Sequence, residues 1–336
     1  MAQQLTYRVE KHLLAAPFRI SGYVFEASDL VVVELDDGTY RGRGEGGGVY
    51  YLGDEAPQMI ATLEANRAAI ESCGSREELR QLLPPCGARN AVDCAMWEME
   101  ADRLGMPAYR IAGVDAPRPL VTTFTLGADT PEVMAQGARN YASARAIKIK
   151  LTGELDLDIA RVRAVREARP DVWLGVDSNQ GFGIADLPTL VAAMVEQRVS
   201  LLEQPVARGR EADLEGFQSA IPLAADESAL GLADVAGLVG RFQTVNIKLD
   251  KCGGLTEALL IAEEARKLGL GVMVGNMVAT SLAMAPAFIL GQLCDVVDLD
   301  GPTFLKQDRE PGVEYSDGHI WCPDDVWGTS AALSAA

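Results

Sequence analysis

The sequence contains very little histidine. Among 336 residues there are only two, His12 and His319, near opposite ends of the chain. Sites built from a cluster of imidazole ligands are therefore excluded, and schemes that place a histidine beside a serine or cysteine nucleophile are disfavoured. Acid–base chemistry must come from lysine, aspartate, glutamate or tyrosine.

Paired cysteines, excess positive charge and long apolar runs are also missing. The six cysteines include no C-x-x-C pair, which disfavours a zinc or redox site and indicates small core residues in a reducing compartment. The formal net charge of −18 would repel nucleic acid and anionic lipid, so we expect neither as a partner. No segment is typical of a signal peptide or a membrane span, and we expect a cytoplasmic protein.

Residues 1–117 have the mixed pattern of an α+β unit. The run LVVVEL, the Asp37-Gly38 turn and the segment from Thr39 onward predict a β-hairpin, and helices are expected over 56–72 and 88–105. GRGEGG, at 42–47, fits G-x-G-x-x-G, but no helix follows it, so a dinucleotide site is not predicted. We interpret these glycines as a flexible lid.

From about residue 118 the pattern becomes a strict alternation of strands and helices. Eight short apolar strands are expected at VTTFTL, AIKIKL, WLGVDSN, SLLEQP, PLAADE, TVNIKL, GVMVGN and VVDLDG. They recur about every 25 residues with helical patterns between them, which predicts βα units around a parallel sheet. Eight such strands favour a closed barrel over an open sheet.

A carboxylate stands at the end of three successive strands. Asp177, Glu203 and Asp226 are 26 and 23 residues apart, one βα unit each. A single acidic residue there more often caps the next helix, but three in one cavity repel one another and need a cation. Three oxygen ligands suit Mg²⁺. Asn179 is expected to support this site.

Lysines flank the expected metal site. Lys148 and Lys150 end the second strand on the same side of it, and Lys248 ends the sixth strand, across the barrel. A metal with an ammonium on each side suits proton transfer at the carbon next to a carboxylate, through an enediolate, with Lys150 and Lys248 as the acid/base pair. The alternative is solvated strand-end lysines, and we assign Lys251 to that kind.

Five of these segments together resemble a known family. IKIKL, GVDSNQG, LLEQP, LAADES and NIKLDKCGGLTEA, in this order and spacing, resemble the muconate-lactonizing-enzyme subgroup of the enolase superfamily. The resemblance implies an α/β fold: a (β/α)7β modified TIM barrel over residues 118–305, and an α+β capping domain formed by residues 1–117 and a returning tail, 306–336. It also implies Mg²⁺ as the cofactor.

The last strand narrows the resemblance. DLDGPTFL is similar to the D-x-D signature of dipeptide epimerases, such as the L-Ala-D/L-Glu epimerases of murein peptide recycling. This similarity implies that Asp298 and Asp300 bind the α-ammonium of a dipeptide that is epimerised at its C-terminal α-carbon. Lys148 and Thr125 are expected to contact the same substrate.

The lid departs from the pattern of those epimerases. Their mobile loop carries an arginine for the glutamate side chain, whereas PFRISGYVFEA places Tyr23 near that position. Tyr50 and Tyr51, in the second lid segment GGGVYYLGDEA, favour an apolar or aromatic side chain on the substrate. The substrate is therefore expected to be L-Ala-D/L-Glu or a related, more apolar dipeptide.

Other functions fit the same metal and lysines. A cycloisomerase, a dehydratase or an N-acylamino-acid racemase would use them on substrates that lack the free ammonium for which Asp298 and Asp300 are suited. A non-catalytic barrel that binds an amino-acid derivative or a protein is the alternative outside enzymes. Many relatives assemble into homo-oligomers, but the sequence identifies no interface.

Overall fold

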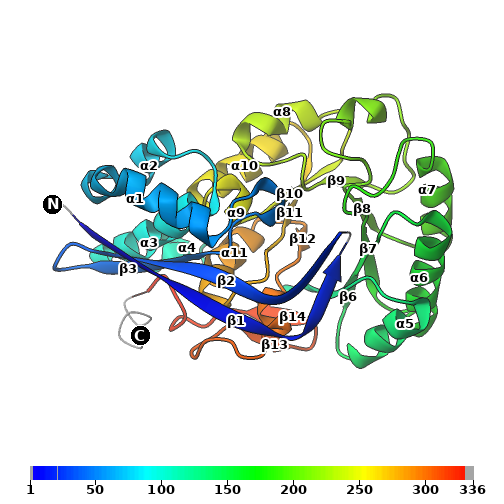
Figure 1. The fold of residues 1–336 in the computed structure, drawn as a ribbon, viewed down its shortest axis with the longest axis horizontal. Coiled ribbons are helices and arrows are strands. Elements are labelled where there is room, and N and C mark those ends of the chain that lie inside the picture. The colour runs from blue at the N-terminus through cyan, green and yellow to red at the C-terminus, as the bar shows by residue number, and fades with distance from the viewer. Residues whose placement is uncertain (1–2, 21, 330–336) are drawn as a thin grey trace.

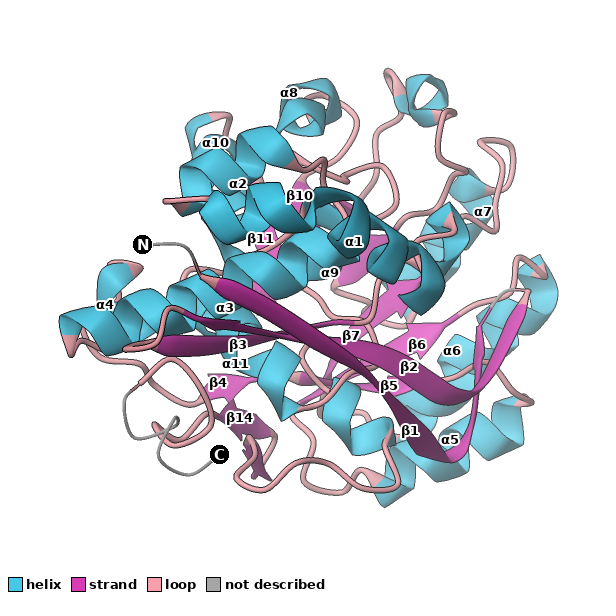
Figure 2. Ribbon diagram, turned by 60° about the vertical axis from the view of Figure 1, so that its left-hand side comes forward, coloured by secondary structure: helices cyan, strands magenta, loops and turns pink. Residues whose placement is uncertain are grey.

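The computed structural model describes residues 3–20 and 22–329, which form a capping part and a barrel. Figure 1 shows the capping helices on one side of the barrel and a long hairpin of the first two strands running toward the opposite side. Figure 2 shows this hairpin crossing in front of the barrel strands. In the described part of the chain, no helix is long and apolar enough to cross a membrane.

The capping part is a three-stranded antiparallel sheet covered by three helices. Its elements are β1 (Gln4–Ile20), β2 (Tyr23–Asp36), β3 (Arg41–Gly46), α1 (Ala56–Ser72), α2 (Arg76–Leu82) and α3 (Gly87–Leu104). Alternate residues of β2, such as Val31 and Val33, pack with α1 and α3 in a core of their own. The predicted hairpin and both predicted helices are confirmed. β1 and α2 were not predicted.

The glycines of β3 have a packing role instead of the predicted lid role. A Cβ on Gly42 would lie 2.0 Å from the Ala95 carbonyl oxygen, and one on Gly44 would lie 2.0 Å from that of Ala91. Both carbonyls belong to α3, so the alternate glycines let the helix backbone approach the strand closely. The flexible-lid interpretation of residues 42–47 is therefore wrong for Gly42 and Gly44, which pack against α3.

The barrel confirms the fold predicted from the alternating pattern. Eight parallel strands follow one another in chain order: β5 (Thr123–Leu126), β6 (Ala146–Lys150), β7 (Trp173–Asp177), β8 (Leu201–Glu203), β9 (Leu223–Ala225), β10 (Thr244–Ile247), β11 (Gly271–Val274) and β12 (Val296–Val297). The helices between them are α5 (Pro131–Asn140), α6 (Leu155–Ala168), α7 (Leu187–Glu196), α8 (Val235–Leu238), α9 (Leu249–Cys252), α10 (Leu255–Lys267) and α11 (Ser281–Gly291).

The barrel is nearly closed, and side chains complete the last seam. In the described residues, no backbone ladder joins β12 to β5. The Leu299 amide instead donates to Thr122 Oγ1 at 2.9 Å, and Thr123 Oγ1 donates to Asp298. β12 has only two residues, so this seam depends on hydrogen bonds beyond the end of the strand.

The C-terminal tail contacts both parts of the molecule. It forms β13 (Glu314–Ser316) and β14 (His319–Trp321), and β14 pairs with β4 (Leu120–Val121) just before the barrel. Further along, Trp327 Nε1 donates to the Arg43 carbonyl at 2.8 Å, and the Gly328 amide donates to Glu98 at 3.0 Å. These contacts support our proposal that the tail belongs with the capping domain.

Candidate active site

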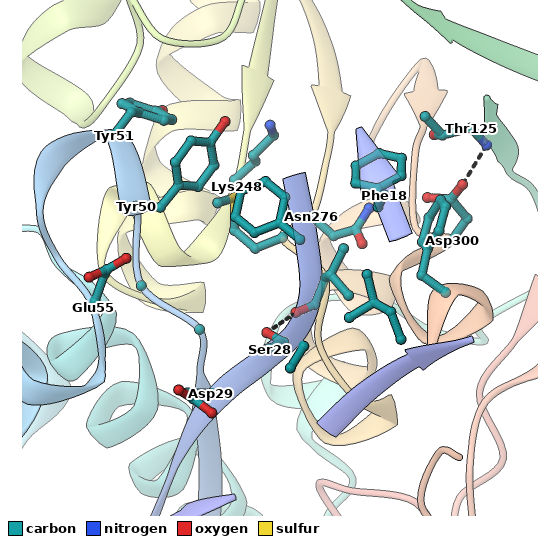
Figure 3. A pocket seen from close by; sticks show the side chains of 18 of the residues that line it. Phe18, Ser28, Asp29, Tyr50, Tyr51, Glu55, Thr125, Lys248, Asn276 and Asp300 are labelled. Carbon is teal, nitrogen blue, oxygen red and sulfur yellow. Dashed lines mark hydrogen bonds between the residues drawn. The ribbon is translucent and has the colours of Figure 1, made fainter. Parts of the chain in front are cut away.

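A cavity of about 360 Å³ lies between the carboxyl ends of the barrel strands and the capping part. The barrel contributes charged groups to it, including Lys148, Lys150 and Lys248. The capping part contributes rings, including Phe18 and Tyr50 (Figure 3). The cavity therefore has a charged floor and an aromatic wall.

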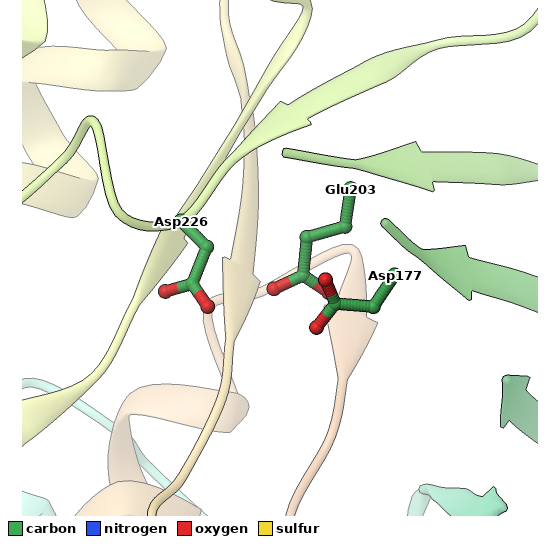
Figure 4. Close-up of side chains that lie close together, drawn as sticks. All are labelled: Asp177, Glu203 and Asp226. Atoms are coloured by element: carbon green, nitrogen blue, oxygen red, sulfur yellow. The ribbon is translucent and has the colours of Figure 1, made fainter. Parts of the chain in front are cut away.

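The three predicted metal ligands converge at the floor of the barrel mouth. Asp177 and Glu203 end β7 and β8, and Asp226 follows β9. All three are at most 1% exposed, and an oxygen from each lies within 4.8 Å of the others (Figure 4). Neighbouring parallel strands bring their ends together, which explains how residues so far apart in sequence meet.

The electrostatics of this triad fit a cation. Burial, followed by the charge of Asp177, raises the pKa of Glu203 to about 7. Among the described residues, Glu203 Oε2 is buried and accepts no hydrogen bond, with Lys148 Nζ 3.5 Å away, while Oε1 accepts one from Asn246 Nδ2 at 2.6 Å. A divalent ion would relieve the repulsion and take the unsatisfied oxygen, as three hard oxygen ligands favour.

An ammonium group approaches the triad from each side. Lys150 Nζ lies 2.5 Å from Asp177 Oδ2, and Lys248 Nζ lies 2.6 Å from Asp226 Oδ2. β6 and β10 are four strands apart in the barrel, so the two lysines face the cavity from opposite sides. A carbon atom held above the triad would have an amine on each face.

Lys251 was predicted to be a solvated lysine, and this prediction is wrong. Its side chain is completely buried, and Nζ lies 2.5 Å from Asp226 Oδ1 and 2.6 Å from the Asp226 carbonyl oxygen. It also donates to the Asn246 carbonyl at 3.0 Å. A lysine on α9 thus fixes one oxygen of Asp226, while Lys248 contacts the other.

Asp298 and Asp300 lie on the cavity wall in different environments. Asp298 is ion-paired with Lys148. Asp300 Oδ2 accepts a hydrogen bond from the Thr125 amide at 2.6 Å (Figure 3). Burial, followed by the charge of Asp298, raises the pKa of Asp300 to about 7. Asp300 is therefore the carboxylate with the greater need for a cation.

The structure brings Asn179 to the cavity and leaves Tyr23 outside it. The Asn179 backbone amide donates to Asp177 Oδ1 at 2.8 Å, and Asn179 lines the cavity. Tyr23 is 45% exposed and does not line the cavity. Its ring lies 4.6 Å from that of Tyr50, so it supports the aromatic wall from behind. A direct contact of Tyr23 with the substrate stays a prediction.

Several residues of the site were not predicted from the sequence. Asn246 lies two residues before Lys248, and their i, i+2 spacing could have revealed that both point inward. Phe18, Phe25 and Phe304 line the cavity, with the rings of Phe18 and Phe304 only 4.7 Å apart. β1 has few buried positions, so no local apolar pattern marks Phe18 as a cavity residue.

The fold and the site define a class: a capped barrel enzyme with a buried carboxylate metal site and a lysine on each side of it. Residues 132–334 match the family model described as "Enolase C-terminal domain-like". The chain therefore belongs to the enolase superfamily, and it is an isomerase of the epimerase or racemase type.

Three characterised relatives carry different substrate names. An L-Ala-D/L-Glu epimerase of Escherichia coli is 36% identical, covering 91% of this chain and 96% of its own. An N-acetyl-D-glutamate racemase of Pseudoalteromonas is 41% identical over 72% and 76%. A hydrophobic dipeptide epimerase of Roseobacter litoralis is 33% identical over 95% and 96%. The chain is thus similar to dipeptide epimerases, without one substrate being fixed.

A solved structure shares the whole fold. It is an enolase family member from Agrobacterium tumefaciens with homology to dipeptide epimerases, bound to sodium and L-Ala-L-Glu. It is 36% identical with a TM-score of 0.92, covering 97% of this chain and 100% of its own. This agreement covers both the capping part and the barrel.

Proposed function

We propose that this protein is a Mg²⁺-dependent dipeptide epimerase that inverts the α-carbon of the C-terminal residue. The observation that carries the proposal is Asp300, a buried carboxylate on the wall of a cavity whose floor is a metal triad between two lysines. The paired Asp298 and Lys148 leave Asp300 as the group that a substrate ammonium would neutralise.

In this proposal, the lysines move the proton. Asp177, Glu203 and Asp226 would hold a Mg²⁺ ion, which would supply positive charge to stabilise the negative charge that develops on the substrate carboxylate. Lys150, as the neutral amine, takes the α-proton from one face, and the C–H electron pair moves toward the carboxylate. Lys248, as the ammonium, returns a proton to the opposite face. The reverse reaction exchanges the two roles, so one site serves both stereoisomers.

Asp300 orients the substrate at its other end. The α-ammonium of the N-terminal residue would sit beside Asp300 Oδ2, near the Thr125 amide that already donates to this oxygen. Charge-assisted hydrogen bonds of this kind are roughly twice as strong as neutral ones. Binding at both ends places the α-carbon between the lysines.

The cavity favours a C-terminal side chain without negative charge. Among the described lining residues there is no arginine, and the three lysines, Lys148, Lys150 and Lys248, are each paired with a carboxylate. The carboxyl-bearing lining residues are Asp29, Glu55, Asp226, Glu227, Asp298 and Asp300. A glutamate side chain would meet like charge, whereas an apolar or aromatic one would meet Phe25, Tyr50 and Met277.

The racemisation of an N-acylamino acid is the second candidate, because the relative with the highest identity among those above is an N-acetyl-D-glutamate racemase. It would use the same triad and lysines. An N-acyl substrate offers no ammonium to Asp300, however, and N-acetylglutamate brings two carboxylates into a cavity that is rich in them. The charge balance therefore favours the dipeptide.

Deuterium exchange at the α-carbon tests the proposal. The protein with Mg²⁺ would be incubated in D₂O with dipeptides whose C-terminal residues are apolar, aromatic, cationic or acidic, and with the matching N-acetyl amino acids. We expect a one-mass-unit gain in the apolar and aromatic dipeptides. Exchange confined to N-acetyl amino acids would refute the dipeptide proposal, and exchange fastest in acidic dipeptides would refute the specificity.

A further inference from the structure

One buried carboxylate, close in sequence to Lys248, links the barrel to the aromatic wall of the cavity. Asp250 lies on α9, two residues after Lys248, and is 5% exposed. Its Oδ1 accepts hydrogen bonds from the Gly47 amide at 3.0 Å and the Gly48 amide at 3.3 Å. Asn90 Nδ2, on α3, donates to the same oxygen at 3.1 Å. A single barrel side chain thus holds two successive amides of the capping part.

Those amides begin a tightly folded loop. Gly48 has φ of +69°, and a Cβ there would lie 1.9 Å from the Asp54 carbonyl oxygen. The Val49 amide donates to that oxygen at 2.7 Å, and Asp54 Oδ2 accepts from the Gly87 amide at 2.7 Å. The loop is therefore closed on itself and fastened to α3.

The loop carries two aromatic rings of the cavity wall. Tyr50 and Tyr51 lie on one turn of 3₁₀ helix (Tyr50–Leu52), with ring centroids 5.2 Å apart, and both line the cavity. Figure 3 shows them beside Lys248. Among the described residues, the buried Tyr51 hydroxyl has no hydrogen-bond partner, so no hydrogen bond fixes the position of this ring.

We propose that Asp250 is a positioning residue that sets the distance between the Tyr50–Tyr51 wall and Lys248, and thereby selects the C-terminal side chain of the substrate. The proposal rests on the proposed function. Asp250 does not line the cavity, so it acts only through the loop. The Asp250 carboxylate connects α9, which begins directly after Lys248, to the loop that carries Tyr50 and Tyr51.

The test compares three variants. Asp250→Ala removes the acceptor, and Asp250→Asn keeps a carbonyl oxygen at the same place. Asp93→Ala is the matched control, because Asp93 is a 1% exposed carboxylate that also joins α3 to the barrel, through the Thr256 amide at 3.0 Å. It does not line the cavity either. If Asp250→Ala does not fold, Asp250→Ser, which shortens the acceptor, takes its place.

Two readouts separate positioning from general loosening. The substrates are dipeptides with C-terminal Phe or Ala. We expect Asp250→Ala to raise KM for the Phe dipeptide at least about tenfold, while kcat changes about threefold or less. The ratio of kcat/KM for the Phe dipeptide to that for the Ala dipeptide should therefore fall. Asp250→Asn should stay within about threefold of the parent protein, and Asp93→Ala should leave the preference unchanged. Hydrogen exchange at the Gly47 and Gly48 amides should accelerate at least about tenfold in Asp250→Ala alone.

The outcomes also distinguish the two proposals. Equal loss of preference in Asp250→Ala and Asp93→Ala, or an unchanged preference despite faster amide exchange in Asp250→Ala, would overturn the positioning role. If the parent protein turns over no dipeptide, the proposed function fails. Amide exchange at Gly47 and Gly48 would still show whether Asp250 anchors the loop.

Discussion

Replacing Asp300 by asparagine should separate substrates with a free ammonium from those without one. The variant keeps the shape of the side chain and an oxygen for the Thr125 amide, but it removes the charge that would face the ammonium. A hydrogen bond to a charged group contributes about 1.5–3 kcal/mol, so kcat/KM for L-Ala-L-Phe should fall by about 10- to 150-fold.

The pH dependence gives this prediction a direction. Burial and Asp298 raise the pKa of Asp300 to about 7, so the free protein carries the negative charge above about pH 7 and loses it below. The kcat/KM of the parent protein should therefore decline as the pH falls through 7. This step should be smaller in Asp300→Asn, in which Glu203 still titrates near pH 7, so the difference between the two proteins should be largest above pH 7.

The assay is polarimetric or chiral-chromatographic epimerisation of L-Ala-L-Phe from pH 6 to 8.5. N-Acetyl-L-Ala-L-Phe is the substrate control, and Asp308→Asn is the protein control, because Asp308 accepts from the Ser281 amide and does not line the cavity. An equal loss for the free and acetylated substrates, or no loss at all, would refute the role of Asp300.

Three further predictions concern the lysines and the glycine strand. Lys248→Ala should lower the epimerisation rate about 10²- to 10⁴-fold yet retain deuterium exchange on one stereoisomer, because Lys150 still reaches one face of the α-carbon. Exchange on both stereoisomers would contradict the assignment of the two lysines to opposite faces. Lys251→Met should lower the free energy of unfolding in urea by about 3–5 kcal/mol, since it breaks a buried pair, whereas the exposed Lys267→Met should cost under about 1 kcal/mol; equal costs would contradict this. Gly44→Ala should cost about 1–3 kcal/mol or more by the same measurement, against little for Gly237→Ala, which has open space around its Cβ; a neutral Gly44→Ala would refute the close helix contact.

The sequence was sufficient for the barrel and its catalytic floor. Strands that recur at one βα unit place Asp177, Glu203 and Asp226 at neighbouring strand ends, because connections in a parallel barrel leave little freedom in strand order. The i, i+2 relation then places Lys148 and Lys150 on one side of a strand. Local periodicity fixes both relations, so they could be predicted before any tertiary contact was known. The cytoplasmic location and the murein role stay predictions.

Contacts between distant segments had to come from the tertiary structure. Lys251 follows a strand end like many solvated lysines, and only the tertiary structure buries it against Asp226. Lys148 pairs with Asp298, 150 residues away, and among the described residues no ion pair is made by Asp300. Such choices depend on which charges meet after the barrel closes, and no local pattern encodes them.

The capping part divides in the same way. Its helices and hairpin follow from apolar spacing, but the strand β1 has too few buried positions to show a period of two. The glycines of β3 suggest flexibility when considered alone. A Cβ added to Gly42 or Gly44, however, would lie only 2.0 Å from a carbonyl oxygen of α3, so the strand packs directly against this helix. The sequence by itself determined the class of chemistry, through residue types at strand ends. The side-chain preference depends on where Asp250 and its loop place two tyrosines, a matter of distances between domains that only the folded chain decides.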